Sequence, residues 1–293
     1  MTDRPLIFGE MLHDRFPDGR EILGGAPFNV AWHLQGFGAA PLLVSRIGSD
    51  RAGERALEAM DAWGLETTAI EIDPERPTGS VVVDLGGGEP RYAIDPDQAY
   101  GHIEAALPAA TRTPSLLYHG TLALWSSPSR GAWADLRRRF ASPVFVDVNL
   151  RAPWWNPALA EALLGRATWA KLSLEELDRL AVGGAPPAAR AGDLCRRHGL
   201  RHVIVTLGDG GAMAVDADGA AVTVAATIPD RIVDTVGAGD AFAAVMILGE
   251  LAGWGLPIAI ARASAVAGAV CGLRGATTVE HRFYEPFLEE WGK

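Results

Sequence analysis

The sequence predicts an α/β protein with a doubly wound, mainly parallel sheet and a small β flap. Short apolar segments alternate with segments of helical period over most of the chain, which is typical of a parallel sheet with helices on both faces. Residues 79–94 interrupt this alternation with two apolar segments around a glycine-rich turn, as in a β-hairpin. Later, a glycine turn at 237–239 opens a long run of small and apolar residues, which predicts a core helix.

Two strand–helix pairs open the chain. Residues 5–8 and 41–47 are apolar and are predicted strands. Between them a helix is expected to begin near Pro27, because proline fits the first position of a helix. A second helix is expected to follow Asp50, which the rhythm of apolar residues after it supports.

The flap is assigned to about residues 10–23 and 79–94. In the second segment, two apolar stretches flank the turn Gly86-Gly87-Gly88-Glu89-Pro90. A hairpin has no crossover helix, so we expect it to lie off the main parallel sheet. The glycine run joins two strands and does not precede a helix, so we interpret it as a hairpin tip and not as a phosphate loop.

The strand–helix alternation resumes near residue 115. Strands are predicted at 116–118, 143–148, 169–172 and 202–206, a helix at 129–140 and a hairpin at 211–224. Ser173 and Glu176 have the spacing of a capping box, which predicts a helix start there. The apolar stretch 241–261 is divided by Gly253, Gly255 and Pro257, so we expect two core helices and not a membrane span.

Composition restricts the function classes. The chain has 293 residues, of which 48% are hydrophobic and 21% charged, as in ordinary globular proteins. Without a linker-like cluster or a repeat, we expect a single domain over residues 1–293. The net charge of −10 argues against a nucleic-acid or membrane partner, because both bind basic surfaces. The two cysteines and the absence of an export signal predict reduced thiols and a cytoplasmic location.

The turn Gly237-Ala238-Gly239, followed by Asp240, is the leading candidate site. A glycine turn that opens a helix leaves N–H groups unpaired at the positive end of the helix dipole, where phosphate groups bind. A carboxylate in the first helical turn can then serve as a base for a hydroxyl that attacks phosphorus. The alternative is a turn that only starts a core helix.

Polar residues also cluster where predicted strands end, which is where ligands bind in parallel sheets. They are Asp147, Asn149, Arg151, Lys171, Ser173, Glu176, Thr206, Gly208, Gly211 and Asp234. Carboxylates, hydroxyls, an anion-binding turn and one arginine are the groups that phosphoryl transfer from a magnesium–nucleotide complex uses. Taken singly, each residue also has a structural explanation as a turn, capping or salt-bridge residue.

Two other nucleotide-binding patterns are excluded. Lys171 is the only lysine besides Lys293 and lies outside any glycine-rich loop, which excludes a Walker-type site. No Gly-x-Gly-x-x-Gly follows the first strand, which excludes a Rossmann oxidoreductase. Lys171 is assigned with Ser173 to the nucleotide side of the site.

Residues 24–31 (GGAPFNVA) and 234–242 (DTVGAGDAF) resemble the two signatures of the PfkB (ribokinase-like) carbohydrate kinase family. The resemblance extends from Phe8-Gly9-Glu10 to Gly275-Ala276. The first signature and the segment before it are most similar to those of fructokinases. The resemblance implies a ribokinase-like fold and transfer of the γ-phosphate of ATP, with Mg²⁺, to a primary hydroxyl of a sugar.

The resemblance also implies roles in catalysis. Asp240 matches the catalytic base of the family, and the backbone amides of Gly237, Ala238 and Gly239 match its anion hole. Arg151 fits a role in steering the transferred phosphate. Together these groups would serve the reacting end of the sugar.

The same resemblance implies a sugar site. Gly24, Gly25 and Asn29 match sugar-contacting residues of the family. Asp14 matches the acidic residue that holds sugar hydroxyls, and a carboxylate that accepts two hydroxyls orients the substrate.

Nucleotide and cation sites are implied by the resemblance as well. Thr206, Gly208 and Gly211 match a nucleotide-binding turn. Glu176 matches the acidic residue that organises Mg²⁺ through water, although Ser173 stands where asparagine is usual, so altered magnesium placement is expected. Asp234 matches a residue near a monovalent-cation site, which implies K⁺.

The expected reaction is phosphorylation of fructose to fructose 6-phosphate. Asp95 and Asp97 lie in the lid where many relatives have basic or aromatic residues, which favours a neutral sugar if this loop reaches the substrate. The alternative is that residues 95–100 are only a helix start, with Asp97 as its cap. Kinases of ribose, of another neutral sugar or of ketodeoxygluconate remain alternatives, as does a non-catalytic sugar sensor on this fold. The open strand edges of the flap favour a homodimer through the lid.

Overall fold

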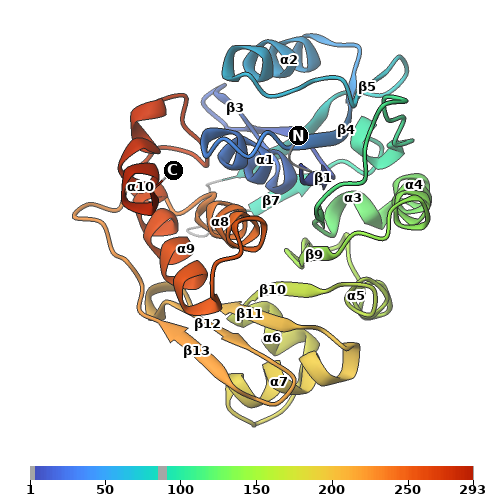
Figure 1. Ribbon diagram of the computed structural model, residues 1–293. Coiled ribbons are helices and arrows are strands. Elements are labelled where there is room, and N and C mark those ends of the chain that lie inside the picture. The colour runs from blue at the N-terminus through green and yellow to red at the C-terminus, as the bar shows by residue number, and fades with distance from the viewer. Residues whose placement is uncertain (1–3, 85–90, 293) are drawn as a thin grey trace.

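The computed structural model describes residues 4–84 and 91–292, and a long twisted sheet runs through it (Figure 1). In the described part of the chain this sheet has nine strands. From one edge to the other they are β13 (Ala221–Val224), β12 (Ala212–Val215), β11 (His202–Thr206), β10 (Trp169–Ser173), β9 (Val144–Asp147), β8 (Leu117–His119), β1 (Leu6–Phe8), β4 (Leu42–Gly48) and β5 (Ile70–Asp73).

The sheet is mainly parallel, as the sequence predicted. Neighbouring strands from β5 to β11 pair in parallel, and β12 and β13 add an antiparallel hairpin. The strand order reverses between β1 and β8. Such a reversal places the carboxyl ends of these two strands beside a crevice where ligands bind in open α/β sheets.

Helices cover both faces of the sheet, so the doubly wound architecture is confirmed. One layer consists of α1 (Ala26–Gly36), α2 (Arg51–Trp63), α8 (Ala238–Ala252), α9 (Leu256–Val270) and α10 (Glu285–Trp291). The opposite layer consists of α3 (Leu122–Trp125), α4 (Ser127–Arg139), α5 (Pro157–Leu164), α6 (Leu174–Leu180) and α7 (Pro187–His198).

The alternation of side chains along each strand divides the core between these layers. In β1, Ile7 packs with the α1 and α8 layer, whereas Leu6 and Phe8 pack with the opposite layer. The Phe8 ring lies 5.5 Å from that of Trp133 on α4. Successive residues of a strand point to opposite faces, so each buried strand contributes apolar side chains to both cores.

The flap is a separate four-stranded sheet within the described residues. Its order is β3 (Glu21–Gly24), β2 (Leu12–Arg15), β6 (Gly79–Asp84) and β7 (Arg91–Ile94). The β6–β7 and β2–β3 pairs are antiparallel, and β2 pairs with β6 in parallel. The predicted strands around the glycine run are therefore present, while the tip at 85–90 lies outside the described residues.

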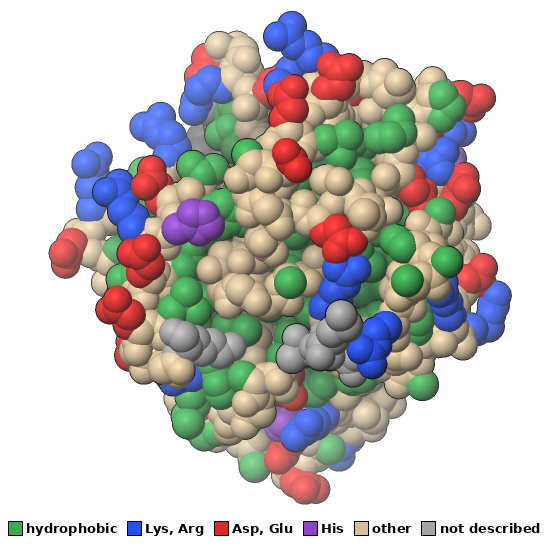
Figure 2. Space-filling model, turned by 45° about the horizontal axis from the view of Figure 1, so that its top comes forward, with side chains coloured by type: hydrophobic (Ala, Val, Ile, Leu, Met, Phe, Trp, Pro, Cys, Tyr) green, Lys and Arg blue, Asp and Glu red, His purple; other side chains and the backbone are tan. Residues whose placement is uncertain are grey.

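The apolar stretch 241–261 forms parts of two helices, as expected. Gly253 ends α8 in the left-handed conformation, and α9 begins with Pro257 in its first turn. Among the residues the structure describes, no helix combines the length and hydropathy needed to cross a membrane. On the molecular face in Figure 2, acidic and basic side chains are interspersed.

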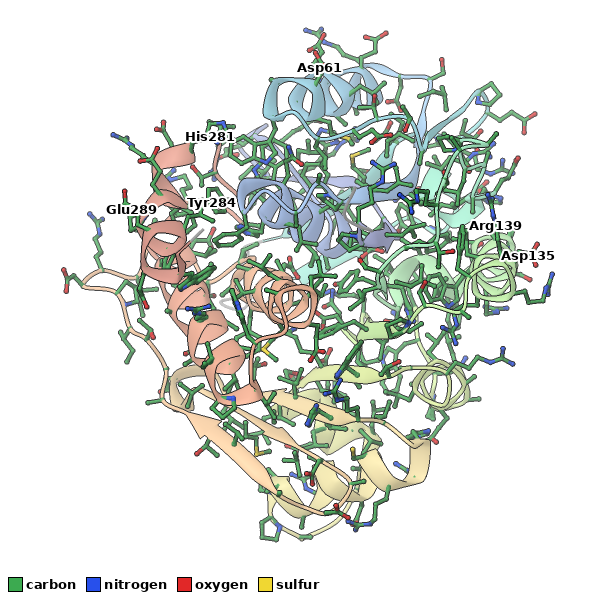
Figure 3. All side chains as sticks on the ribbon, in the orientation of Figure 1. Asp61, Asp135, Arg139, His281, Tyr284 and Glu289 are labelled. Carbon is green, nitrogen blue, oxygen red and sulfur yellow. The ribbon has the colours of Figure 1, made fainter. Side chains whose placement is uncertain are left out.

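An aromatic cluster fixes α1 between α8 and the C-terminal segment. Tyr284 is 1% exposed and shares a 3.0 Å hydrogen bond with His33 of α1, and its ring meets that of Phe37 edge-on. Figure 3 shows Tyr284 and His281 beside each other near α10. His281 stacks on Trp63 of α2 at 4.4 Å. This packing holds α1 in place, and α1 carries part of the candidate site.

Candidate active site

The glycine turn begins α8, as predicted. Gly237 is the N-cap residue and has a φ of +81°, in the left-handed region, which glycine adopts without a steric penalty. A Cβ at this position would lie 2.3 Å from Cβ of Ala276. Within the described residues, no side chain caps α8. The Ala238 N–H makes only a long 3.4 Å hydrogen bond to the Thr235 carbonyl oxygen, so the first-turn N–H groups offer a backbone site suited to an anion.

Asp240 is hydrogen-bonded to a residue of the 24–31 segment, far away in the sequence. Asn29, on α1, donates a 2.8 Å hydrogen bond from Nδ2 to Oδ2 of Asp240. Oδ1 of Asn29 is buried and has no hydrogen-bond partner in the described part of the chain. This oxygen is thus an acceptor that a ligand hydroxyl could satisfy, because a buried polar group without a partner is unfavourable.

The flap places Asp14 and Gly24 next to Asn29. A Cβ on Gly24 would lie 3.7 Å from Oδ2 of Asp14 and 3.8 Å from Oδ1 of Asn29. Gly25 has a φ of +106°, and a Cβ there would lie 2.7 Å from the carbonyl oxygen of Glu10. Glycine is therefore required at residue 25, and the four residues assigned to the sugar site lie near one another.

Burial controls the protonation of three carboxyl groups around this place. It raises the pKa of Asp240, against the lowering effects of the Asn29 hydrogen bond and of Lys171 and Arg151. Burial also raises the pKa of Asp14 to about 6. For Glu10, burial raises the pKa to about 7, although backbone N–H groups oppose this. Arg151 lowers all three values and is thus a shared counter-charge.

Glu10 is a residue of this site that the sequence analysis did not assign. It follows β1 and is 2% exposed, and its Oε2 lacks a hydrogen-bond partner in the described part of the chain. Its position at the end of the first strand, in the Phe8-Gly9-Glu10 segment, was the available signal. Ligands bind beyond strand ends, and a glutamate two residues after the buried strand β1 fits that pattern.

Lys171 is engaged with a second carboxylate. Its Nζ donates to both carboxylate oxygens of Asp147 at 2.9 and 2.8 Å. The residues are directly opposite each other on β10 and β9. A Cβ on Gly239 would lie 3.4 Å from Nζ of Lys171. Lys171 therefore lies beside the turn that precedes Asp240.

The capping box at Ser173 and Glu176 is present. The Ser173 N–H donates to Oε2 of Glu176 at 2.7 Å, and the Glu176 N–H donates to Oγ of Ser173 at 3.2 Å. Oε1 of Glu176 accepts a 2.6 Å hydrogen bond from the Leu150 N–H. Each carboxylate oxygen has two lone pairs, so one position on each stays open to a water molecule.

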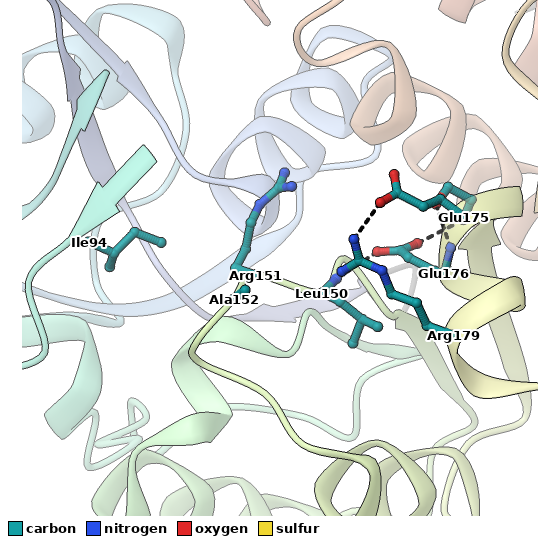
Figure 4. A pocket seen from close by; sticks show the side chains of 8 residues that line it. Ile94, Leu150, Arg151, Ala152, Glu175, Glu176 and Arg179 are labelled. Atoms are coloured by element: carbon teal, nitrogen blue, oxygen red, sulfur yellow. Dashed lines mark hydrogen bonds and ion pairs between the residues drawn. The ribbon is translucent and has the colours of Figure 1, made fainter. Parts of the chain in front are cut away.

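Glu176 and Arg151 line one hollow of about 310 Å³. Figure 4 shows it between the loop after β9 and the start of α6, with an ion pair between Glu175 and Arg179 at one side. Water-mediated Mg²⁺ fits the Glu176 carboxylate and the Ser173 hydroxyl. In the described residues, no group of three or more acidic, histidine or cysteine side chains forms a direct metal site.

The predicted nucleotide turn follows β11. Thr206 pairs with Ser173 across β11 and β10, so the two residues end neighbouring strands. Gly208 and Gly211 have φ values of +62° and +92°, and a Cβ on Gly211 would lie 2.0 Å from the Val224 carbonyl oxygen. The turn therefore adjoins the start of α6, at the same end of the sheet as the glycine turn of α8.

Asp234 ties two loops together. Its carboxylate accepts hydrogen bonds from the N–H groups of Val236 at 3.1 Å and Gly275 at 3.2 Å. These bonds explain an aspartate here without a cation. The monovalent-cation site stays a prediction.

Asp97 in the lid has a structural partner. It accepts a 2.9 Å hydrogen bond from Nε of Arg76, and His102 lies 3.1 Å away. The side chain is 69% exposed. A short 3₁₀ helix, η1 (Ala99–His102), follows, and its N-cap is Gln98 rather than Asp97. These contacts favour a structural role for Asp97, without the capping that the sequence analysis considered.

Comparisons with known proteins identify similar sugar and riboside kinases. The pattern of the pfkB family carbohydrate kinases matches residues 3–282. A fructokinase from Rhizobium leguminosarum bv. trifolii is 30% identical over 257 residues, which are 81% of this chain and 76% of the relative.

Solved structures share the fold. Fructokinase from Vibrio cholerae O395, bound to fructose, ADP and calcium ion, has a TM-score of 0.82 and 23% identity, with 97% of this chain and 98% of that one covered. Aminoimidazole riboside kinase from Salmonella enterica, complexed with aminoimidazole riboside and an ATP analog, has a TM-score of 0.82 and 24% identity over 98% and 99% of the two chains.

Proposed function

This chain belongs to the pfkB family of carbohydrate kinases, and we propose that it phosphorylates a primary hydroxyl of a neutral sugar, with fructose as the first candidate and fructose 6-phosphate as the product. The main support is the meeting of Asp240 with Asn29 at 2.8 Å beside the glycine turn. Asp14 and Gly24, from the flap, lie next to the same asparagine. The proposed base, anion site and hydroxyl acceptors therefore adjoin one another.

In the proposed reaction, Asp240 removes the proton from the sugar hydroxyl. The hydroxyl oxygen then attacks the γ-phosphorus of ATP in line, and the bond to ADP breaks. The amides of residues 237–239 stabilise the charge that develops on the transferred phosphoryl group, and Arg151 steers this group. Mg²⁺, held through water by Glu176 beside Ser173, would neutralise charge on the ATP phosphates when bound.

The charges around the sugar site support a neutral substrate. Glu10, Asp14 and Asp240 adjoin it, and Arg151 interacts with all three. The carboxylate of a sugar acid would meet these like charges and would be disfavoured. This argument replaces the one based on Asp97, because Asp97 is paired with Arg76. Neutral sugars are therefore preferred over ketodeoxygluconate.

The remaining assignments belong to the same proposal. ATP is placed near Ser173, Thr206, Gly208 and Gly211, and K⁺ near Asp234. Lys171, which the sequence assigned to the nucleotide side, is bonded to Asp147 instead. The flap is proposed as a lid of a single domain. Its outer strands, β3 and β7, have open edges that a homodimer would cover. A cytoplasmic location is supported by two cysteines that are both free thiols.

Other substrates and a non-catalytic role are the alternatives. A relative of this chain, 28% identical, is an aminoimidazole riboside kinase, which supports ribosides as the second substrate class, along with ribose. A sugar sensor on this fold needs no base. This chain retains Asp240, and Asn29 donates a hydrogen bond to it, which supports the kinase over the sensor.

The direct test is release of ADP from Mg-ATP in the presence of neutral sugars, sugar acids and nucleosides. We expect the highest kcat/KM with fructose. A clear preference for a riboside would keep the kinase and change the substrate. Measurable sugar binding without turnover of any compound would contradict the kinase and favour the sensor.

Asp14→Ala should raise the sugar Kd by about 10- to 100-fold and leave the ATP Kd within about twofold, because it removes a charged acceptor of hydroxyl groups. Asp18→Ala is the matched control, since Asp18 is an exposed carboxylate of the same flap, paired with Arg20. Calorimetric titration with each ligand measures both constants. Equal weakening of both ligands would place Asp14 outside the sugar site.

The pH dependence of sugar binding gives a second readout of Asp14. Burial raises the pKa of Asp14 to about 6, and only the ionised form accepts two hydroxyl hydrogens. Sugar affinity of the unmodified protein should therefore fall as pH decreases through about 6. In the Asp14→Ala variant this part of the decrease should be absent.

A further inference from the structure

Lys171 and Asp147 form a buried ion pair on the sheet face that α8 covers. They are 6% and 1% exposed. The alternation along β10 sets this orientation, because Ala170 and Leu172 pack into the opposite layer and Lys171 must then point the other way. The parallel register places Asp147 directly opposite, where its two carboxylate oxygens accept from Nζ at 2.9 and 2.8 Å.

The pair adjoins the main chain next to Asp240. Nζ of Lys171 lies 3.4 Å from the point that a Cβ on Gly239 would occupy. Gly239 precedes Asp240 in the first turn of α8. The ammonium group therefore lies against the turn that carries the base.

The sheet does not need an ion pair at this position. Removing two charges from water is costly, and apolar residues of similar volume often replace a buried pair without loss of stability. Several neighbouring positions on the same face of this sheet are filled by side chains of the hydrophobic core, such as Tyr118, Phe145 and Ile204. Because the Lys171–Asp147 pair lies beside the turn of Asp240, the charge of Lys171 can serve a function there.

We propose that Lys171, held in place by Asp147, is a positioning residue that keeps Asp240 ionised and ready to accept the proton of the substrate hydroxyl. This inference rests on the proposed role of Asp240 as the base. Under this inference Lys171 acts on the base Asp240. The sequence analysis had assigned Lys171 to the nucleotide side of the site.

The electrostatics of Asp240 support this role. Its surroundings are Asn29 on α1, Lys171 and Asp147 on β10 and β9, Tyr118 on β8, and, from the loops and the flap, Arg151, Glu10 and Asp14. Burial raises the pKa of Asp240, and Lys171 lowers it. Burial also acts against the charge of Lys171, yet Asp147 more than compensates, so the pKa of Lys171 is raised and the group stays cationic.

The sign of the expected effect follows from these charges. Removal of Lys171 leaves Asp240 with a higher pKa, so a larger fraction is protonated at a given pH. The acid limb of the kcat–pH profile should then move to higher pH, and the lost activity should return at alkaline pH. A residue that only stabilises the fold would lower activity without moving this limb.

The test compares Lys171→Met/Asp147→Asn with the unmodified protein. The double variant removes the pair without leaving one buried charge unpaired. Loss of Lys171 raises the pKa of Asp240, and loss of the Asp147 charge, which repels that of Asp240, offsets part of this rise. We therefore expect the acid limb of kcat to move upward by about half to one pH unit, with about a three- to tenfold lower kcat below the limb. The KM for ATP should stay within about twofold.

A second charge pair, in which Arg46 also binds Glu71 and Glu104, offers a control for the loss of stability. Nε of Arg46 lies 2.9 Å from Asp73, and these side chains are 13% and 1% exposed. Arg46→Met/Asp73→Asn should affect the melting temperature without moving the acid limb. An unchanged limb in the Lys171 double variant would overturn the proposal, and an increase of the ATP KM as the only effect would overturn it in favour of ATP binding.

A readout without turnover separates this inference from the proposed function. The carboxyl ¹³C resonance of Asp240, followed by NMR in the ligand-free protein, should titrate at higher pH in the Lys171 double variant. This shift is expected even if the tested sugars are not substrates. The same titration midpoint in both proteins would overturn the inference and leave the kinase assignment untouched.

Discussion

Asp240→Asn should lower kcat by about 10²- to 10⁴-fold, the usual contribution of a positioned general base. The amide keeps the size of the side chain and can still bond to Asn29, which now donates to Oδ2 of Asp240 at 2.8 Å. It cannot accept the proton of the sugar hydroxyl. Steady-state ADP release measures kcat, and calorimetry should show that sugar binding persists.

A carboxyl group elsewhere on the same helix controls for this substitution. Glu250 is near the other end of α8, its pKa is also raised by burial, and Arg201 lies 3.7 Å from it. Glu250→Gln should therefore leave kcat within about twofold, since the helix places it roughly 15 Å from Asp240 along its axis. Near-normal turnover of Asp240→Asn would remove Asp240 from the role of base.

The main sheet was predictable because its strands are apolar on both faces. Leu6, Ile7 and Phe8 fill the two cores in alternation, and such continuous apolar runs stand out in a sequence. Strand β5 was not predicted. It reads Ile-Glu-Ile-Asp, pairs with β4 at the edge of the sheet as described and uses Glu71 and Asp73 to bind Arg46. The two acidic residues of β5 are accommodated by Arg46 of β4, and the sequence around β5 gives no sign of this partner.

Helices α3, α5 and α7 were also absent from the predicted elements. Helix α3 has four residues, which is too short for a helical period to be recognised. Helix α5 does carry a start signal, since Asn156 caps it by accepting the Leu159 N–H at 2.8 Å. Asparagine before proline at a helix start is a readable pattern, so this helix could have been predicted.

Within the site, the groups close in sequence were easier to predict than their long-range partners. The turn of residues 237–239 and the Ser173–Glu176 capping box are local patterns, and both are present. The Lys171–Asp147 pair was not predicted, although both residues were noted at strand ends. It depends on the register between β9 and β10, and register is set by the packing of the whole sheet rather than by either strand alone.

Gly237→Ala should lower kcat by about 10²- to 10³-fold, the loss expected when anion-hole donors are displaced. The residue has a φ of +81°, and an added Cβ would lie 2.3 Å from Cβ and 2.4 Å from Cα of Ala276. Because these contacts are with backbone-anchored atoms, the turn must move. The amides of Ala238 and Gly239 would then no longer point to the transferred phosphoryl group.

Gly253→Ala, at the other end of α8, separates this displacement from the strain of a left-handed alanine. Gly253 has a φ of +68°, and an added Cβ would meet no atom of the described residues beyond its chain neighbours and its own helix within 4 Å. Its variant therefore carries about the same conformational cost of 1–2 kcal/mol without a collision. We expect both variants to lose thermal stability and only Gly237→Ala to lose turnover by orders of magnitude. Equal losses of turnover would assign the effect to the stability of α8, whereas normal turnover of Gly237→Ala would show that the amides of this turn do not form the anion hole.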